Sequence, residues 1–226
     1  MDSNQETDFQ LTNPKLIKDR ENLIGELQSQ GIRDPKVLDA LRRTPRHLFV
    51  PETLQSQAYA NKPLSIGQGQ TISQPYIVAF MTEVLRPQSE DKVLEVGTGS
   101  GYQAAVLSPL VNQIYSLEIV PELGARSQSL LQRLGYSNIH TRIDDGALGW
   151  PEAAPFDKIL LTAATHKVPQ ALFEQLKVGG LLLAPIKGDK AEQLVLFTKH
   201  SSDRIDSQEL LPVSFVLLTG SSINLP

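Results

Sequence analysis

The sequence contains no cysteine, which removes disulfide bonds, thiolate nucleophiles and cysteine metal clusters from the possible chemistry. Histidine is also scarce, and none of the four shows the paired spacing that is typical of a metal site: they are His47, His140, His166 and His200. Lone histidines of this kind are more simply explained as structural or solvated side chains. We therefore expect no metal ion.

Long apolar runs are absent as well, since none approaches the roughly 20 residues that a membrane-spanning helix needs. Residues 1–10 are polar and lack the apolar stretch of a secretion signal, so we expect a cytoplasmic protein. The formal net charge of -4 disfavours broad electrostatic binding to nucleic acid or anionic lipid. We expect neither as a partner, and we expect a monomer.

The strongest positive signal is a glycine-rich stretch at residues 93–103. An apolar run of valine and leucine ends there in three glycines at alternate positions, followed by an alanine-rich segment. This order predicts a buried strand, a tight turn and a helix. Glycines allow the backbone to approach a ligand closely, and a helix start offers unpaired N–H groups. The stretch therefore predicts a nucleotide-type pocket.

The glycine spacing favours a ligand without phosphates. Tyr102 stands where the dinucleotide fingerprint G-x-G-x-x-G has its third glycine, which disfavours pyrophosphate. S-adenosylmethionine fits better, and Glu95 offers an acid to its cationic end. Glu118 follows a second apolar strand, about 20 residues past the first glycine, where an acid accepts hydrogen bonds from ribose hydroxyls. The alternative is that these residues merely shape the strand ends of an α/β protein.

Strands alternate with helices over residues 90–186, which predicts a mainly parallel sheet whose ligand loops gather at the carboxyl ends of the strands. Asp145 follows a third strand and either bonds the adenine amine or holds the turn. Thr162 ends a fourth strand. Further strands are expected at 181–186, after a glycine turn at 179–180, and at 193–198 and 210–218. We expect a flexible tail at 1–13 and a single domain at 14–226, made of N-terminal helices and a substrate loop (14–90), a cofactor-binding core (91–186) and C-terminal strands (187–226).

The polar stretch at residues 63–74 lacks periodicity and leads into a helix that begins at Pro75. A long polar loop that feeds a helix is a candidate substrate lid. Within it, Ser73 is equally well explained as the N-cap of the helix, and Thr71 as a turn residue. A basic cluster earlier in the chain leaves a similar choice between an anion-binding site and a solvated helix face: Arg42, Arg43, Arg46 and His47.

Five motifs, taken in order, resemble the protein-L-isoaspartate O-methyltransferase family: residues 45–52, 67–75, 93–102, 145–146 and 176–180. The glycine motif alone indicates a class I methyltransferase, whereas the Gln-Thr-Ile-Ser loop at 70–73 is particular to this family. The resemblance implies a Rossmann-like, doubly wound seven-stranded sheet and S-adenosyl-L-methionine as the methyl donor. It also implies methylation of the free carboxylate of L-isoaspartyl residues in damaged proteins and peptides.

The resemblance also assigns site residues. Ser73 matches the active-site serine, and Thr71 and Ile72 match the substrate-binding positions beside it. The implied cofactor-binding residues are Glu95, Gly97, Thr98, Gly99, Ser100, Gly101, Glu118, Asp145 and Gly146.

This chain departs from the family pattern at three places. Asp144 replaces a common glycine, Tyr76 replaces a histidine and so is no general base, and residues 211–216 match the family's substrate-lining final strand only loosely.

Three other functions compete with this interpretation. A small-molecule or RNA methyltransferase can use the same fold, because fold alone does not fix the substrate. Methyltransferases that act on the exocyclic amines of adenine or cytosine resemble one another in an Asn/Asp-Pro-Pro-aromatic turn. The strand end at residues 162–165 lacks this turn. A cofactor-binding module without catalysis is the second alternative, and a nicotinamide-dependent dehydrogenase is the third.

Overall fold

The computed structural model describes residues 13–220. Its backbone contacts divide the chain into two compact units, Met1–Val84 and Leu85–Pro226, and each is described by itself. The predicted tail lies outside the described residues except for Asn13, which caps α2 (Pro14–Ser29). The prediction of a single domain stays a prediction.

The first unit begins with two helices, α2 (Pro14–Ser29) and α3 (Pro35–Arg43). The side chain of Asp34 accepts a hydrogen bond from the backbone N–H of Lys36, which caps the N-terminus of α3. Both helices form where capping residues and proline predict them. Their apolar faces are buried, and two short 3-10 helices follow: η1 (Arg46–Phe49) and η2 (Glu52–Gln57).

A β-hairpin replaces the aperiodic loop that we expected at residues 63–74. Strands β1 (Leu64–Gly67) and β2 (Gln70–Ile72) pair antiparallel, and helix α4 (Pro75–Leu85) follows. The turn between the strands uses positive φ angles at Gln68 (53°) and Gly69 (68°). Strands of four and three residues are too short to show a period of two in the sequence, so the pattern was not visible.

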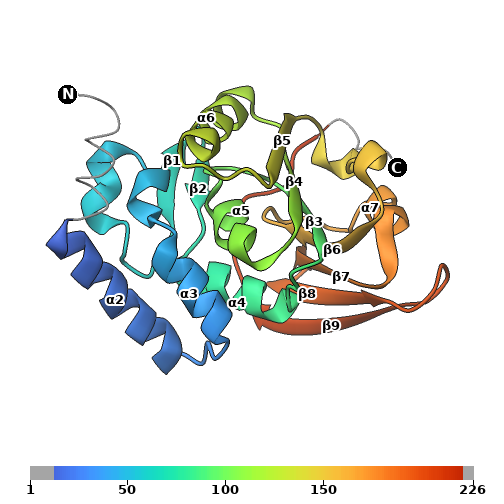
Figure 1. Cartoon of the computed structure of the whole chain (residues 1–226). Helices are drawn as coiled ribbons and strands as arrows, with labels where there is room; N and C mark the ends of the chain where they lie inside the picture. The colour runs from blue at the N-terminus through green and yellow to red at the C-terminus, as the bar shows by residue number, and fades with distance from the viewer. Residues whose placement is uncertain (1–12, 221–226) are drawn as a thin grey trace. The chain divides into compact units, whose positions relative to one another are not determined.

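The second unit is built on a seven-stranded sheet in the order β5-β4-β3-β6-β7-β8-β9 (Figure 1). The first five in this order run parallel, and β8 and β9 are antiparallel additions at one edge. This confirms the predicted mainly parallel seven-stranded sheet. The strands are β3 (Lys92–Val96), β4 (Gln113–Glu118), β5 (Ile139–Ile143), β6 (Phe156–Leu161), β7 (Leu176–Lys187), β8 (Glu192–Lys199) and β9 (Ile205–Pro212).

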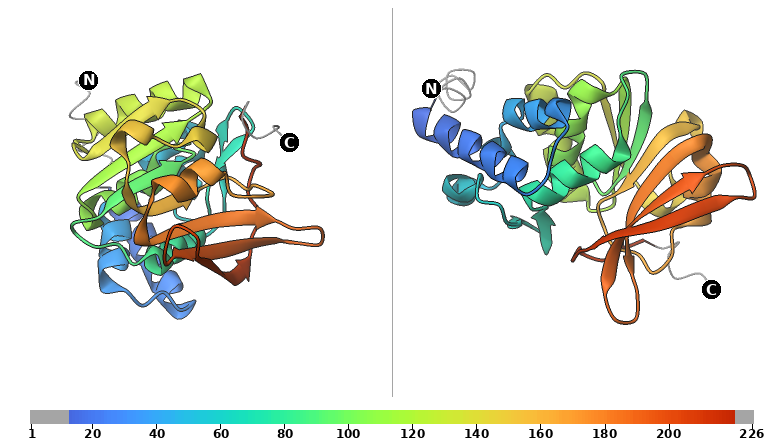
Figure 2. Two further views of the ribbon diagram at one scale, coloured as in Figure 1. Left: turned by 90° about the vertical axis from the view of Figure 1, so that its right-hand side faces the viewer. Right: turned by 90° about the horizontal axis from the view of Figure 1, so that it is seen from below.

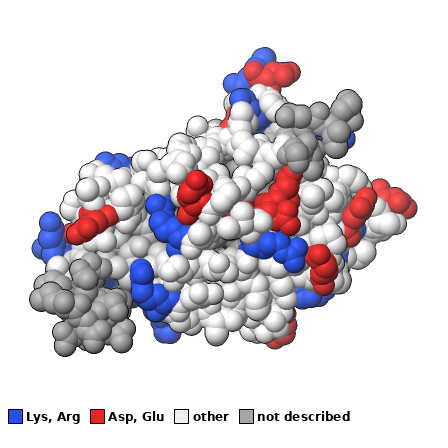
Figure 3. Space-filling view, turned by 90° about the horizontal axis from the view of Figure 1, so that it is seen from above, with Lys and Arg blue, Asp and Glu red and all other residues white. Residues whose placement is uncertain are grey.

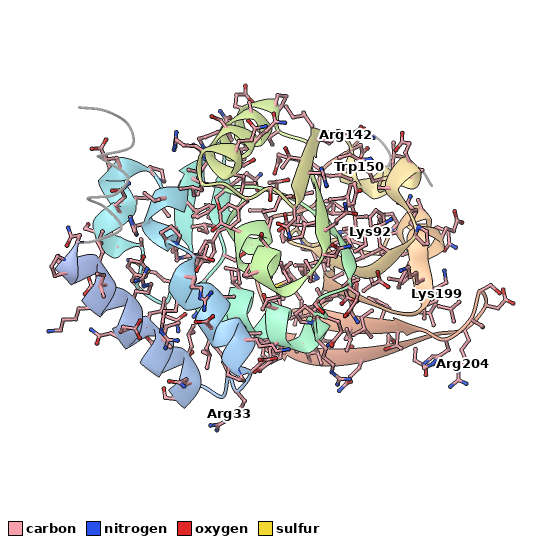
Figure 4. The ribbon with its side chains drawn as sticks, viewed as in Figure 1. Arg33, Lys92, Arg142, Trp150, Lys199 and Arg204 are labelled. Atoms are coloured by element: carbon pink, nitrogen blue, oxygen red, sulfur yellow. The ribbon has the colours of Figure 1, made fainter. Side chains whose placement is uncertain are left out.

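Helices connect the parallel strands. The longer ones are α5 (Tyr102–Leu107), α6 (Pro121–Arg133) and α7 (Gln170–Gln175), and the single-turn ones are η3 (Ser108–Leu110), η4 (Gly146–Leu148) and η5 (Pro151–Ala153). Helix α6 packs on β4 and β5, whereas α7 packs on β7. Strands β8 and β9 form a long hairpin (Figure 2). From this hairpin the buried ammonium group of Lys199 donates to the carbonyls of Phe173 and Leu176 at the end of α7 (Figure 4).

The strand predicted at 193–198 is confirmed by β8, whereas the glycine turn predicted before residues 181–186 and the strand predicted at 210–218 were partly wrong. Strand β7 runs through the expected glycine turn, and Gly179 takes a φ of +83° at an irregularity inside the strand. The strand predicted at 210–218 is instead β9, which ends at Pro212. An edge strand pairs on one side only and tolerates polar residues on its open side, so β9 carries no long apolar run.

The sheet order places a topological switch point at the centre of the second unit. Strand β3 pairs with β4 on one side and with β6 on the other, so the chain leaves β3 in one direction and later returns on the opposite side. Open α/β sheets bind ligands at the carboxyl ends of the strands at such a point. The glycine-rich stretch follows β3 directly at this position.

Candidate cofactor site and substrate loop

The glycine loop between β3 and α5 adopts a conformation that suits glycine. Gly97, Gly99 and Gly101 have φ angles of 101°, 54° and 85°, a region that other residues rarely enter. The N–H groups of Gly97 and Thr98 donate to the carbonyl of Leu117 at 2.8 and 3.1 Å, which ties the loop to β4. The predicted strand, turn and helix are therefore confirmed.

Position 97 must be glycine for two reasons: the positive φ angle of the turn and the close approach of a neighbouring side chain. A Cβ atom on Gly97 would overlap the Oγ1 atom of Thr162 at the end of β6. The Thr162 hydroxyl donates to the carbonyls of Val96 and Gly97 at 3.1 and 2.5 Å. Thr162 thus clamps the start of the loop against β6.

Glu118 holds the middle of the same loop. One carboxylate oxygen accepts a hydrogen bond from the N–H of Gly99 at 2.6 Å, and the other accepts from the N–H of Val120 at 3.0 Å. A carboxylate has about four acceptor positions, so this arrangement leaves capacity for two ribose hydroxyls. The predicted ribose contact stays a prediction, and the loop-bracing bond was not visible in the sequence.

Glu95 lies beneath the loop and is fully buried. Its carboxyl accepts a hydrogen bond from the hydroxyl of Ser116, which lies 2.6 Å from the hydroxyl of Thr98. Burial raises the pKa of Glu95 to about 8, although the Ser116 hydrogen bond opposes the shift, and repulsion from Glu118 adds to it.

Within residues 13–220, the Oε1 atom of Glu95 is buried and has no hydrogen-bond partner. Since Glu95 is buried and its raised pKa keeps the carboxyl largely protonated at pH 7, the hydrogen bonds that link it through Ser116 to Thr98 indicate that it supports the loop. Ser116, which joins Glu95 to Thr98, was missed because a serine inside a strand carries no distinguishing pattern.

The acidic turn after β5, which contains Asp145, has the structural role that was one of the two alternatives for this residue. The Asp145 side chain accepts from the N–H of Ala147 at 3.0 Å and so caps η4. A Cβ atom on Gly146 would overlap the Val96 side chain, so glycine lets this turn pack against β3. A bond from Asp145 to the adenine stays a prediction.

The segment after β9 crosses the carboxyl edge of the sheet. It pairs with the end of β6, where Ala164 donates to the carbonyl of Val216 at 2.8 Å and accepts from Leu218 at 2.7 Å. A Cβ atom on Gly220 would overlap the Asp145 carboxylate at the end of β5. Strands β3 and β4 lie between β6 and β5, so this segment borders the candidate cofactor site.

Ser73 lies in the first unit between β2 and α4, and its hydroxyl is not the cap of α4. The Oδ1 atom of Asn61 accepts from the N–H of Tyr76 at 3.0 Å and takes that position. Among the described residues, Ser73 Oγ makes no hydrogen bond. Thr71 is exposed and Ile72 is buried. The Ser73 hydroxyl is therefore available to a ligand.

The basic cluster does not form one anion-binding surface. Arg42 pairs with Glu21 at 3.0 Å, and Arg43 pairs with Asp39 at 2.9 Å. The other two members, Arg46 and His47, are buried. The Nδ1 atom of His47 lies 2.8 Å from the Tyr59 hydroxyl, and burial, assisted by the charge of Arg20, lowers the pKa of His47 to about 4.

Edge strand β5 carries an aromatic cluster. The guanidinium of Arg142 lies 4.0 Å from the ring centroid of Trp150 (Figure 4). The ring of Tyr115 contacts those of Trp150 and His140 at 5.1 and 4.9 Å between centroids. These contacts fasten η4 and η5 to the sheet. Within residues 13–220, no group of three or more His, Cys, Asp or Glu side chains is arranged to hold a metal ion.

A switch point, a glycine loop with three positive φ angles, and acids at the ends of β3 and β4 define a class I S-adenosylmethionine-dependent methyltransferase. The family model described as protein-L-isoaspartate(D-aspartate) O-methyltransferase matches residues 18–223. The chain belongs to this family. It is a transferase that methylates isoaspartyl residues with S-adenosyl-L-methionine as the donor.

Individual relatives agree with this family. A protein-L-isoaspartate O-methyltransferase 1 of Syntrophobacter fumaroxidans is 51% identical over 86% of this chain and 91% of its own. A protein-L-isoaspartate O-methyltransferase of a Picosynechococcus species is 49% identical over 87% of this chain and 88% of its own.

Solved structures show the same architecture. One protein-L-isoaspartate O-methyltransferase superposes with a TM-score of 0.82 at 29% identity and covers 90% of this chain and 67% of that chain. A putative protein-L-isoaspartate O-methyltransferase of Plasmodium falciparum, in complex with S-adenosyl-L-homocysteine, has a TM-score of 0.77 at 25% identity, with 88% and 98% covered. The ligand in that structure is the demethylated form of the donor.

Proposed function

We propose that the Ser73 hydroxyl orients the substrate carboxylate of an L-isoaspartyl residue, with Thr71 and Ile72 as neighbouring substrate contacts. The observation that carries this assignment is the capping of α4 by Asn61, which leaves the Ser73 hydroxyl without a hydrogen bond among the described residues. A hydroxyl donor suits a carboxylate, since a hydrogen bond to a charged acceptor is stronger than a neutral one.

The chemistry requires positioning more than acid–base catalysis. A carboxylate is already ionised at pH 7, so it needs no base before it attacks the methyl group that the cofactor supplies. Tyr76, at the position of the family's histidine, is consistent with this. Correct placement of two reactants can contribute roughly 7 to 11 kcal/mol. The residues of this chain therefore act by binding and orienting.

The proposed cofactor site uses the residues gathered at the switch point. Glu118 would bond the ribose, and Asp145 and Gly146 would adjoin the adenine. Glu95, whose raised pKa keeps its carboxyl largely neutral at pH 7, would support, from beneath, the loop that receives the cationic end. The glycine loop, residues 97–101, would allow close backbone approach. These assignments are supported by the positive φ angles of the loop and by the hydrogen bond from Gly99 to Glu118.

Replacement of Ser73 tests the proposed substrate role. We expect Ser73→Ala to lower kcat/KM for an isoaspartyl peptide roughly tenfold to a hundredfold, while S-adenosylmethionine affinity stays unchanged. The melting temperature should also stay unchanged, since Asn61 caps the helix. Ser73→Asp should be worse than Ala, because it places a second negative charge against the incoming carboxylate.

The same peptide with normal aspartate in place of isoaspartate is the matched control for the substrate. Ser73→Asn is the control for Ser73→Asp, because it has a side chain of similar size without the negative charge. Full activity in Ser73→Asp would remove the carboxylate-orienting role.

The remaining proposals concern location and partners. We propose a monomeric cytoplasmic enzyme, and the net charge of -4 supports the absence of broad electrostatic binding to nucleic acid or anionic membranes. On the face drawn in Figure 3, basic and acidic side chains of the described residues are interspersed rather than gathered by sign. No helix within residues 13–220 has the length and apolar character to cross a membrane. Analytical ultracentrifugation and cell fractionation test these proposals.

A further inference from the structure

The backbone around Ser73 is held by a segment that lies well before it in the sequence. The fully buried guanidinium of Arg46, on η1, donates from Nη2 to the carbonyl of Ser73 and from Nε to the carbonyl of Ala58, both at 2.8 Å. A guanidinium presents its donors in a rigid plane, so these two bonds fix both the distance and the orientation of the Ser73 peptide.

Asn61 holds the residues that follow Ser73. Its Oδ1 atom accepts from the N–H of Tyr76 at 3.0 Å, and its carbonyl accepts from the Gln74 side chain at 3.0 Å. Asn61 is itself fixed, because its amide nitrogen donates to the side chains of Glu26 on α2 and of Gln30, the C-cap of that helix. Ser73 is therefore held at its own carbonyl and through the residues that follow it, while its hydroxyl makes no hydrogen bond among the described residues.

From this arrangement we infer that Arg46 is a positioning residue for the methyl transfer, which acts by fixing the Ser73 backbone so that its hydroxyl meets the substrate carboxylate. The inference rests on the proposed role of Ser73. A buried cation has a large desolvation penalty, and the hydrogen bonds that Arg46 donates to the carbonyls of Ala58 and Ser73 hold those carbonyls in place. Small displacements of a reacting group are costly, so the effect should appear in turnover.

The test is a double-mutant cycle with Arg46→Lys and Ser73→Ala, measured with an isoaspartyl peptide. Lysine keeps the charge, but its N–H donors all lie on one nitrogen atom. It therefore cannot reproduce the planar geometry by which arginine bonds two carbonyls. We expect Arg46→Lys to lower kcat at least tenfold, with S-adenosylmethionine affinity changed less than twofold. In the Ser73→Ala background the same substitution should lower kcat less than threefold, because its target is already gone.

Arg43→Lys is the matched control, since Arg43 is on the surface and, within residues 13–220, pairs with Asp39. Its kcat should equal that of the wild type. An equal loss from Arg46→Lys in both backgrounds would overturn the positioning role and leave Arg46 a purely structural residue. If Ser73→Ala itself has no kinetic effect, the proposed function of Ser73 fails instead, and the two failures are distinguishable.

If Arg46→Lys does not fold, Asn61→Ala replaces it in the same cycle. It removes the support on the residues that follow Ser73 without removing a buried charge. If the losses of kcat from Asn61→Ala and Ser73→Ala are not additive, the positioning of Ser73 by residues 46–61 is supported. Additive losses of kcat would overturn that positioning role.

Discussion

The carboxylate of Glu118 accepts a hydrogen bond from the backbone N–H of Gly99 at 2.6 Å. Glu118 ends β4, whereas Gly99 lies in the loop after the neighbouring strand β3. Together with the bonds from Gly97 and Thr98 to the Leu117 carbonyl, this bond fixes the glycine loop on the adjacent strand. The acid proposed to bind the ribose is therefore also the group that shapes the pocket, so its loss should affect the cofactor in two ways.

We expect Glu118→Ala to weaken S-adenosylmethionine binding tenfold or more. A hydrogen bond to a charged acceptor is worth roughly 1.5 to 3 kcal/mol, and the loop also loses its brace. Glu118→Gln keeps one carbonyl oxygen for the Gly99 N–H, so its loss should be smaller. Isothermal titration calorimetry measures both variants, and unchanged affinity in Glu118→Ala would place Glu118 outside the site.

Two glycines of the loop should respond differently to substitution. Gly97→Ala should lower the free energy of unfolding, because its methyl group would overlap Thr162 Oγ1. Gly99→Val should leave a folded chain that has lost activity, since a side chain there crowds the cofactor and strains a φ of 54°. Urea unfolding and methyl transfer are the measurements.

Thr162→Ala added to Gly97→Ala is the control, and it should recover part of the lost stability. A Gly99→Val chain that fails to fold would show that this glycine is structural.

Glu95 should make the folded state less stable as the pH rises. Its pKa is about 8 in the folded protein against 4.5 as the ordinary value, so the folded state holds the proton more tightly. The stabilisation is complete below a pH of about 4.5 and is lost as the pH rises toward 8. Glu95→Gln does not titrate, so its free energy of unfolding should depend less on pH across this range. Identical pH slopes in the two proteins would contradict a raised pKa.

His47 should make the folded state less stable as the pH falls, which is the opposite of the effect of Glu95. Its pKa falls from 6.5 to about 4 on folding, so the unfolded chain binds the proton more tightly. Stability is complete above a pH of about 6.5 and is lost as the pH falls toward 4. His47→Asn should therefore lose less stability than the wild type between these values. His200→Asn, on the surface beside Asp206, is the control and should keep the steep acid dependence.

The sequence by itself determined the class of fold and the chemistry of the loop. Alternating strands and helices over residues 90–186, the three glycines and the acids at strand ends are local patterns, and each appears where it was predicted. The Gln-Thr-Ile-Ser motif identified the family in the same way. Spacing along the chain carries this information because backbone conformation near a glycine or a helix cap depends mainly on neighbouring residues.

Tertiary structure alone decided which partner each polar group takes. Nothing local to Ser73 shows that Asn61 caps α4 or that Arg46 holds the Ser73 carbonyl. Ser116 beneath the loop was equally invisible in the sequence. These contacts join residues that are distant along the chain, and a buried polar side chain takes whichever partner the folded backbone brings within hydrogen-bond distance. Folding thus turned Ser73 from a possible helix cap into an available hydroxyl.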